Sequence, residues 1–143
     1  MSHQITRVPH ADGIARASID ARATCQDEVA KHTQKLRNIA QELTDLPTIR
    51  MAPHVRQSRI ASLHAMQAYS EDILAQLAMY DTIVGKPRLA TRIALSLRNS
   101  AHDHHAFTKV LPDDLHIYGM TLPVAKAFGK HLWDHSTPIG SHR

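Results

Sequence analysis

Histidine is the residue type with the greatest chemical potential in this chain, since 12 occur among 143 residues. His131 and His135 lie four residues apart, a spacing that places two imidazoles on one face of a helix within reach of one divalent metal ion. No glutamate completes the His-Glu-x-x-His or Glu-x-x-His patterns of zinc proteases and di-iron bundles. We therefore expect no metal and no cofactor. If a metal ion is bound, its ligands would be His102, His104, His131 and His135.

A second group of residues with catalytic potential runs from Arg98 to His105. An arginine, a polar neighbour and then histidines several positions later resemble the motif of HEPN-type ribonucleases, a family of all-helical and often dimeric proteins. The resemblance covers eight residues. It implies metal-independent cleavage of an RNA phosphodiester, in which Arg98 stabilises the phosphate, Asn99 is the polar neighbour, and His104 or His105 is the general acid or base. This hypothesis is one of three for the function.

Positive charge gathers in the third quarter of the chain. The net charge is only +4, but residues 61–85 hold three acids and no base, whereas residues 86–109 hold five bases and one acid. The five bases are Lys86, Arg88, Arg92, Arg98 and Lys109. Such a segment could follow the phosphate backbone of RNA or DNA. Aromatic residues make up only 4% of the chain, too few for a platform that stacks single-stranded bases. A second hypothesis is therefore nucleic-acid binding through backbone contacts.

The elements that must position these residues are all predicted to be helices. Apolar residues recur at steps of three and four, and no segment alternates convincingly with a period of two. The predicted helices cover about 13–45, 53–84, 88–106 and 122–135. Pro47 ends the first helix, Gly85 is expected to cap the second in a left-handed conformation, and Thr121 is expected to cap the last. Residues 109–119 are expected to form a turn-rich link, and residues 1–12 and 136–143 irregular tails.

The first two predicted helices are long enough to shape the whole protein. Each has about 30 residues, hence a length of about 45 Å, and the short connection between them predicts an antiparallel hairpin. With the two shorter helices it would form one four-helix bundle-like domain over residues 1–143. The hairpin would outreach the shorter helices and expose apolar surface, unless the first helix breaks near residues 18–23 and folds back to cover it.

This uncovered surface favours a third hypothesis, which we place first. The chain would be a non-enzymatic binding protein, an adaptor or assembly subunit that contacts a protein partner or further copies of itself. With 43% hydrophobic and 21% charged residues it can bury a core. The lone Cys25 excludes a disulfide framework and is expected to be a buried, inert thiol. No uncharged run of 18 residues occurs, so we expect no membrane span and a cytoplasmic protein.

Overall fold

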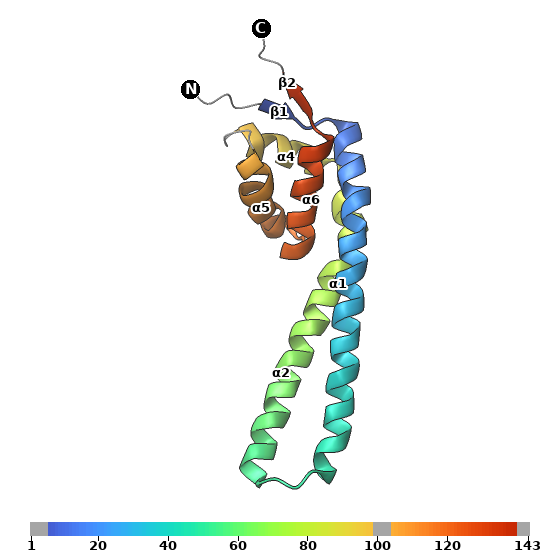
Figure 1. Ribbon diagram of the computed structural model, residues 1–143, viewed down its shortest axis with the longest axis vertical. Helices are drawn as coiled ribbons and strands as arrows, with labels where there is room; N and C mark the ends of the chain where they lie inside the picture. Colours follow the sequence, from blue (N-terminus) through green and yellow to red (C-terminus); the bar gives the residue numbers. More distant parts are fainter. Residues whose placement is uncertain (1–5, 99–103, 140–143) are drawn as a thin grey trace.

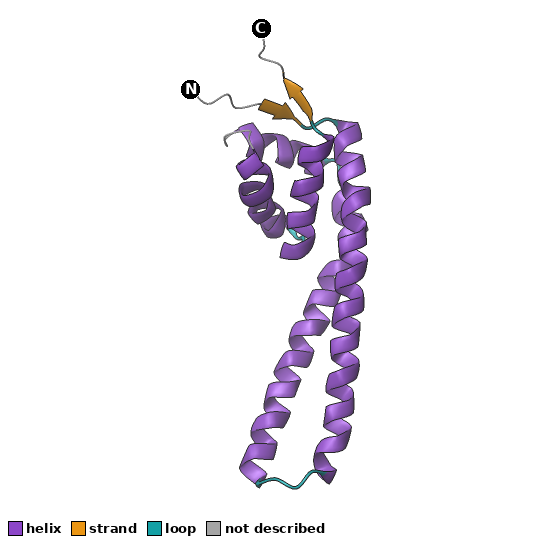
Figure 2. Cartoon of the chain, in the orientation of Figure 1, coloured by secondary structure: helices purple, strands orange, loops and turns teal. Residues whose placement is uncertain are grey.

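The computed structural model describes residues 6–98 and 104–139, and it confirms the all-α fold. Figures 1 and 2 show a long helical hairpin with the shorter helices packed beside one end of it. The helices are α1 (Ala11–Asp45), α2 (Pro53–Ala78), α3 (Tyr80–Val84), α4 (Arg88–Arg98), α5 (Leu111–Tyr118) and α6 (Leu122–His135). A 3-10 turn, η1 (Leu46–Thr48), and a π-helical turn, η2 (Ala106–Val110), complete the helical part. Within the described residues, no helix has the length and apolarity to cross a bilayer.

Helix α1 is continuous over 35 residues, which corresponds to about 52 Å. It begins where the Gly13 amide donates a hydrogen bond of 3.1 Å to Nδ1 of His10. The alternative with a break near residues 18–23 is wrong. Ala17 and Ala21 are completely buried in the core that α1 shares with α6. Small side chains let the two helices approach closely, so these early turns are well packed.

The far halves of α1 and α2 form a projecting arm, which we define as residues 33–69. In Figure 1 the arm extends beyond the shorter helices. Its core is thin, because only Ile39, Leu46 and Leu63 are buried there. Arg59 of α2 donates two hydrogen bonds to the carboxylate of Glu42 on α1, which ties the two helices together on the outside. The predicted antiparallel hairpin is therefore present, and half of its length is a two-helix structure.

The other part of the molecule, which we call the head, consists of residues 11–32 of α1 together with α3 to α6. Its core contains large side chains that are completely buried, namely Phe107, Leu111, Leu115, Phe128 and Leu132. A Cβ atom on Gly129 would lie only 2.1 Å from the carbonyl oxygen of Phe107. Helix α6 and η2 thus meet at backbone contact, which only glycine allows.

The second predicted helix is interrupted, and its predicted cap is wrong. Helix α2 ends at Ala78, and α3 follows after Met79. The Met79 backbone has φ −85° and ψ −2°, so its amide bonds to Gln76 at i−3 and the helix axis shifts. Gly85 has φ −82° and is not left-handed. The left-handed glycine is Gly119, with φ 127°, which closes α5.

The expected link over residues 109–119 is also wrong, because α5 occupies most of it. Pro112 lies in the first turn, where a missing amide hydrogen costs little, and Asp113 and Asp114 follow in the same turn, where carboxylates interact favourably with the helix dipole. These turn-forming residue types therefore start a helix here. The third predicted helix, 88–106, is present as α4 over Arg88–Arg98, and residues 99–103 lie outside the described part.

The ends of the described chain are paired, not irregular as predicted. Strand β1 (Thr6–Val8) pairs with β2 (Thr137–Ile139) in an antiparallel ribbon, with Arg7 opposite Pro138. The physical reason is the contact between α1 and α6. A Cβ atom on Gly13 would lie 2.5 Å from the carbonyl oxygen of His135, so the start of α1 touches the end of α6 and the flanking segments become neighbours. The predicted cap of α6 also differs from the structure. Thr121 is the N-cap residue, but its side chain makes no capping hydrogen bond.

Replacement of Gly129 tests the backbone contact in the head. We expect Gly129→Ala to lower the free energy of unfolding by about 2 kcal/mol, because an added methyl group must push α6 away from η2. Urea unfolding followed by circular dichroism measures this change. Lys126→Ala, an exposed substitution on the same helix, should leave the stability nearly unchanged. Equal stability of the two variants would contradict the packing described here.

Candidate functional site

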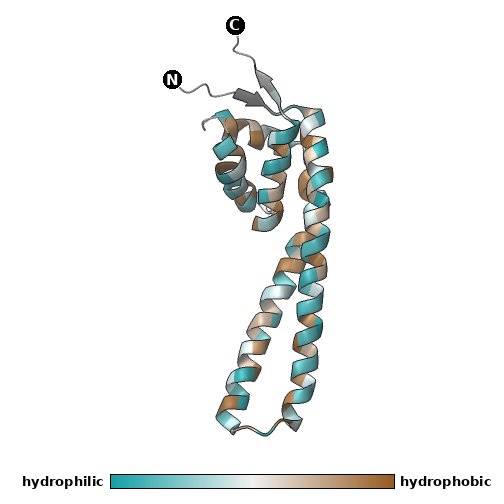
Figure 3. Cartoon of the chain, in the orientation of Figure 1, coloured by the Kyte–Doolittle hydropathy of each residue, from teal (hydrophilic) through white to brown (hydrophobic). Residues whose placement is uncertain are grey.

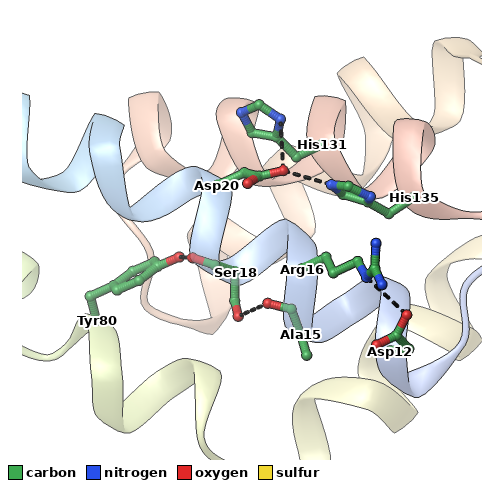
Figure 4. A network of polar contacts seen from close by, with 8 residues as sticks. All are labelled: Asp12, Ala15, Arg16, Ser18, Asp20, Tyr80, His131 and His135. Atoms are coloured by element: carbon green, nitrogen blue, oxygen red, sulfur yellow. Dashed lines mark hydrogen bonds and ion pairs between the residues drawn. The ribbon is translucent and has the colours of Figure 1, made fainter.

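One carboxylate of α1 lies between the two histidines of α6 that the sequence pointed to (Figure 4). His135 donates a hydrogen bond of 2.6 Å from Nε2 to Oδ2 of Asp20, and Nδ1 of His131 lies 3.8 Å from the same oxygen. The i,i+4 spacing puts both imidazoles on the face of α6 that meets α1. The side chains of Asp20, His131 and His135 are 41%, 31% and 27% exposed. The cluster is thus a polar contact at the rim of the α1–α6 interface.

The charges around this cluster favour the ionised carboxylate. The hydrogen bond from His135 lowers the pKa of Asp20 below its ordinary value of 3.8, and the charges of His131 and Arg16 act in the same direction against partial desolvation. Arg16 itself forms an ion pair of 2.9 Å with Asp12, one turn earlier on α1. Asp20 is therefore a stable anion that accepts hydrogen bonds from α6.

The opposite side of the same turn of α1 is held by a tyrosine (Figure 4). The Tyr80 hydroxyl donates a hydrogen bond to the carbonyl oxygen of Ser18. Burial raises the pKa of Tyr80, so it stays a neutral donor. Around this turn, α1 is joined to α3 by Tyr80 and to α6 by His131 and His135.

The three candidate metal ligands that the structure describes, His104, His131 and His135, do not form a metal site. His104 packs edge-on against Trp133, with ring centroids 5.4 Å apart. His131 and His135 contact Asp20 instead, and His102 lies outside the described residues. Over residues 6–98 and 104–139, no group of three or more histidine, cysteine or carboxylate side chains has the arrangement of a metal site.

The five basic residues of the predicted phosphate-binding segment differ in whether they form an ion pair with a described residue. Arg92 forms an ion pair of 3.0 Å with Asp114 at the start of α5, so part of its charge is already compensated. The other four bases are exposed and form no ion pair with any residue that the structure describes; they are Lys86, Arg88, Arg98 and Lys109. The basic segment thus keeps most of its charge available to solvent.

The residues that carry the ribonuclease resemblance are only partly described. Arg98 ends α4 and is exposed, and His104 and His105 are exposed at the start of the next helical stretch. Asn99 lies outside the described residues. Cleavage of RNA by these side chains stays a prediction.

Two features of the structure were missed in the sequence. Asp20 is 115 residues from its partner His135, and only its place on the long amphipathic helix could have suggested an inward contact. A cavity of about 330 Å³ lies where the arm joins the head, with walls from α1, α2, the end of α5 and the start of α6. Its lining includes Thr121, which the sequence presented only as a helix cap.

Comparisons with known proteins give no further assignment, because no protein-family model, curated protein or solved structure matches this chain. What the chain does must therefore be inferred from its own residues and their geometry.

The Asp20 cluster makes a pH-dependent contribution to stability. A depressed pKa means that this contribution is complete above the ordinary carboxyl pKa and is lost as the pH falls through the lower, folded-state value. We expect Asp20→Asn to lower the melting temperature at pH 6, and the difference from the parent protein to shrink below pH 3.8. Thermal unfolding at several pH values measures this difference. Asp134→Asn, an exposed change on α6, serves as control, and a pH-independent effect of Asp20→Asn would contradict the assignment.

Proposed function

We propose that this chain is a self-associating helical assembly protein whose arms pair in antiparallel fashion. The observation that carries the proposal is an exposed stripe along the arm side of α2. Figure 3 shows hydrophobic positions recurring along both helices of the arm as far as its turn. A two-helix hairpin has little core of its own, whereas four helices can enclose a full one. Pairing of two arms would supply the missing two helices.

The stripe lies on one face of α2, because its residues follow steps of three and four. Three large apolar side chains on it are exposed, with 47% for Val55, 46% for Met66 and 62% for Tyr69. Small side chains separate them, and we define the α2 stripe as Val55, Ser58, Ser62, Ala65, Met66, Tyr69 and Asp72. Exposed apolar surface of this kind, flanked by polar residues, is typical of an interface.

The pattern of the α2 stripe is complementary to itself in the antiparallel direction. A two-fold axis that passes Ser62 sets Val55 of one copy opposite Tyr69 of the other, and Met66 opposite the small Ser58. Met66 then packs against a small residue and Tyr69 against the medium-sized Val55, so that side chains of the two helices interdigitate as in helical bundles. Each such pair occurs twice, as the symmetry of a dimer requires.

Charge supports the same direction of pairing. Asp72 ends the α2 stripe near the head, whereas the first turn of α2 holds no acidic residue and follows Arg50. Antiparallel pairing brings Asp72 of one copy to the start of α2 in the other, where the helix dipole and Arg50 are positive. A parallel arrangement would place the two Asp72 carboxylates together, which is unfavourable.

A groove beside the α2 stripe provides room for the second copy. It has a volume of about 470 Å³ and lies between the two helices of the arm. Ile39 and Leu63 form its floor, and Met66 and Tyr69 stand at its edge. Side chains of a second arm can fill this groove and extend the thin core of the arm.

Substitution of Tyr69, the most exposed large apolar residue of the α2 stripe, tests the proposal. We expect the parent protein to be a dimer and Tyr69→Asp to be a monomer, because a carboxylate would be buried in the interface without a partner. Light scattering coupled to gel filtration measures the mass. The matched control is Ile117→Asp, which changes an isoleucine that is 77% exposed on α5, away from the arm. A monomeric parent, or equal dissociation in both variants, would contradict the proposal.

Nucleic-acid binding is a second candidate function, and the exposed cations around α4 favour it. Lys86 and Arg88 form no ion pair with another described residue, whereas Arg92 is paired with Asp114. These free charges could contact successive phosphates of a backbone.

Arg92 provides a matched control for this second function. We expect retention on immobilised RNA to fall steeply with salt. The double variant Lys86→Ala with Arg88→Ala should lose about two phosphate contacts. The slope of log affinity against log salt concentration should therefore become less steep by about two. Arg92→Ala should change the slope less, since its charge is already compensated by Asp114. Absence of retention on immobilised RNA at low salt would contradict this candidate function.

A further inference from the structure

The junction between arm and head holds a second cavity, which is distinct from the groove of the arm although Lys35 and Tyr69 line both. It is the cavity of about 330 Å³ described above, which has the size of a small-molecule pocket. Residues from four helices line it, although α1 and α6 are far apart in sequence. Apolar walls come from Tyr69, Ile73 and Leu122, and polar groups from α1 and α6 approach the same space.

The start of α6 lines one side of this cavity. Helix α6 has 14 residues, and because Pro123 in its first turn carries no amide hydrogen, the amides there without an acceptor within the helix are those of Leu122 and Val124. Thr121 is the N-cap residue, yet its side chain forms no capping hydrogen bond. These amides and the helix dipole favour a negatively charged group at this end.

The Thr121 hydroxyl independently indicates a missing partner. Thr121 is only 4% exposed, and its Oγ1 has no hydrogen-bond partner in the part of the chain that the structure describes. A buried hydroxyl without a partner costs about 1 to 3 kcal/mol.

Two lysines of α1 give the same cavity positive charge. Lys31 and Lys35 are one helical turn apart, and both line it. The charged and titratable neighbours are Glu28, His32 and His116. Burial, with the positive charge of Lys35, lowers the pKa of His32, which is 4% exposed and contacts the Ser70 hydroxyl at 3.2 Å. Nδ1 of His116 donates to the carbonyl oxygen of Met120 at 2.8 Å.

Glu28 is the one acid in this lining, and it does not cancel the two lysines. Its carboxylate is 3.9 Å from Nε2 of His32, on the wall formed by α1. The start of α6 stands on a different wall of the cavity. Lys31 and Lys35 stand on the same α1 wall as Glu28, so the lining as a whole holds two lysines against one carboxylate.

We propose that this cavity binds a small organic phosphate, with the phosphate group at the start of α6 and the apolar body against Tyr69 and Ile73. Lys31 and Lys35 pair with the phosphate oxygens, and the Thr121 hydroxyl donates to one of them. The ligand then contacts α1, α2 and α6 together, so its binding also stiffens the junction between arm and head. The site shares Tyr69 with the α2 stripe and Lys35 with the groove of the arm, whereas Lys31 and Thr121 line this cavity and not the groove, so variants at Lys31 and Thr121 distinguish the two proposals.

Phenyl phosphate is a suitable probe, because it combines a phosphate with an aromatic body of small size. We expect calorimetric titration of the full chain at low salt to show one site per chain. Phenol and inorganic phosphate should each bind at least about tenfold more weakly, since each lacks one half of the recognition. Lys31→Ala and Thr121→Val should weaken binding of phenyl phosphate about tenfold.

The control variant is Lys126→Ala, which removes an exposed charge from α6 outside the cavity. It should bind phenyl phosphate as the parent does. Circular dichroism and gel filtration on each variant show whether the fold and the oligomeric state persist. Absence of binding by the folded parent protein would overturn the proposal. Equal binding by Lys31→Ala, Thr121→Val and Lys126→Ala would overturn it as well.

Discussion

Close contact between α1 and α6 is the constraint on which the rest of the structure depends. Gly13, Ala17 and Ala21 present little side-chain volume, and so the backbone of α6 can lie against the first half of α1. A larger residue at any of these positions would separate the helices. The contact has three consequences: the terminal strands become neighbours, Asp20 meets His131 and His135, and the start of α6 reaches the junction cavity.

The continuity of α1 extends this constraint to the arm. Because α1 runs unbroken from the head to the turn at η1, and Leu77 near the end of α2 is buried in the core of the head, both helices of the arm continue into the head. Few tertiary contacts support the arm besides the thin layer of Ile39, Leu46 and Leu63 and the bond between Arg59 and Glu42. Most of the stability of helices comes from packing of an apolar face. The α2 stripe is therefore the surface where packing of a partner would add most to the stability of the arm.

The sequence predicted the positions of the helices better than the contacts between them. Apolar periodicity identified α1, α2 and α6, since each buries a face with a period near 3.6. The prediction of a turn-rich link over residues 109–119 was wrong because proline and aspartate begin helices as well as turns. Only the burial of Leu111 and Leu115 distinguishes a helix from a turn here. The spacing of His131 and His135 pointed to a shared metal ion, whereas in the structure both imidazoles lie beside one carboxylate. The partner itself, Asp20, depends on how α1 and α6 pack, which local pattern does not encode.

Cross-linking through single cysteines tests the antiparallel pairing of arms most directly. Ser62→Cys places a thiol on the proposed two-fold axis, and Ser58→Cys places one a helical turn away from it on the same exposed face. Because the native Cys25 is buried, it should not interfere. The account predicts that mild oxidation converts the Ser62→Cys protein into a covalent dimer and leaves the Ser58→Cys protein mostly uncross-linked. Failure of the Ser62→Cys protein to cross-link, or equal cross-linking at both positions, would contradict it.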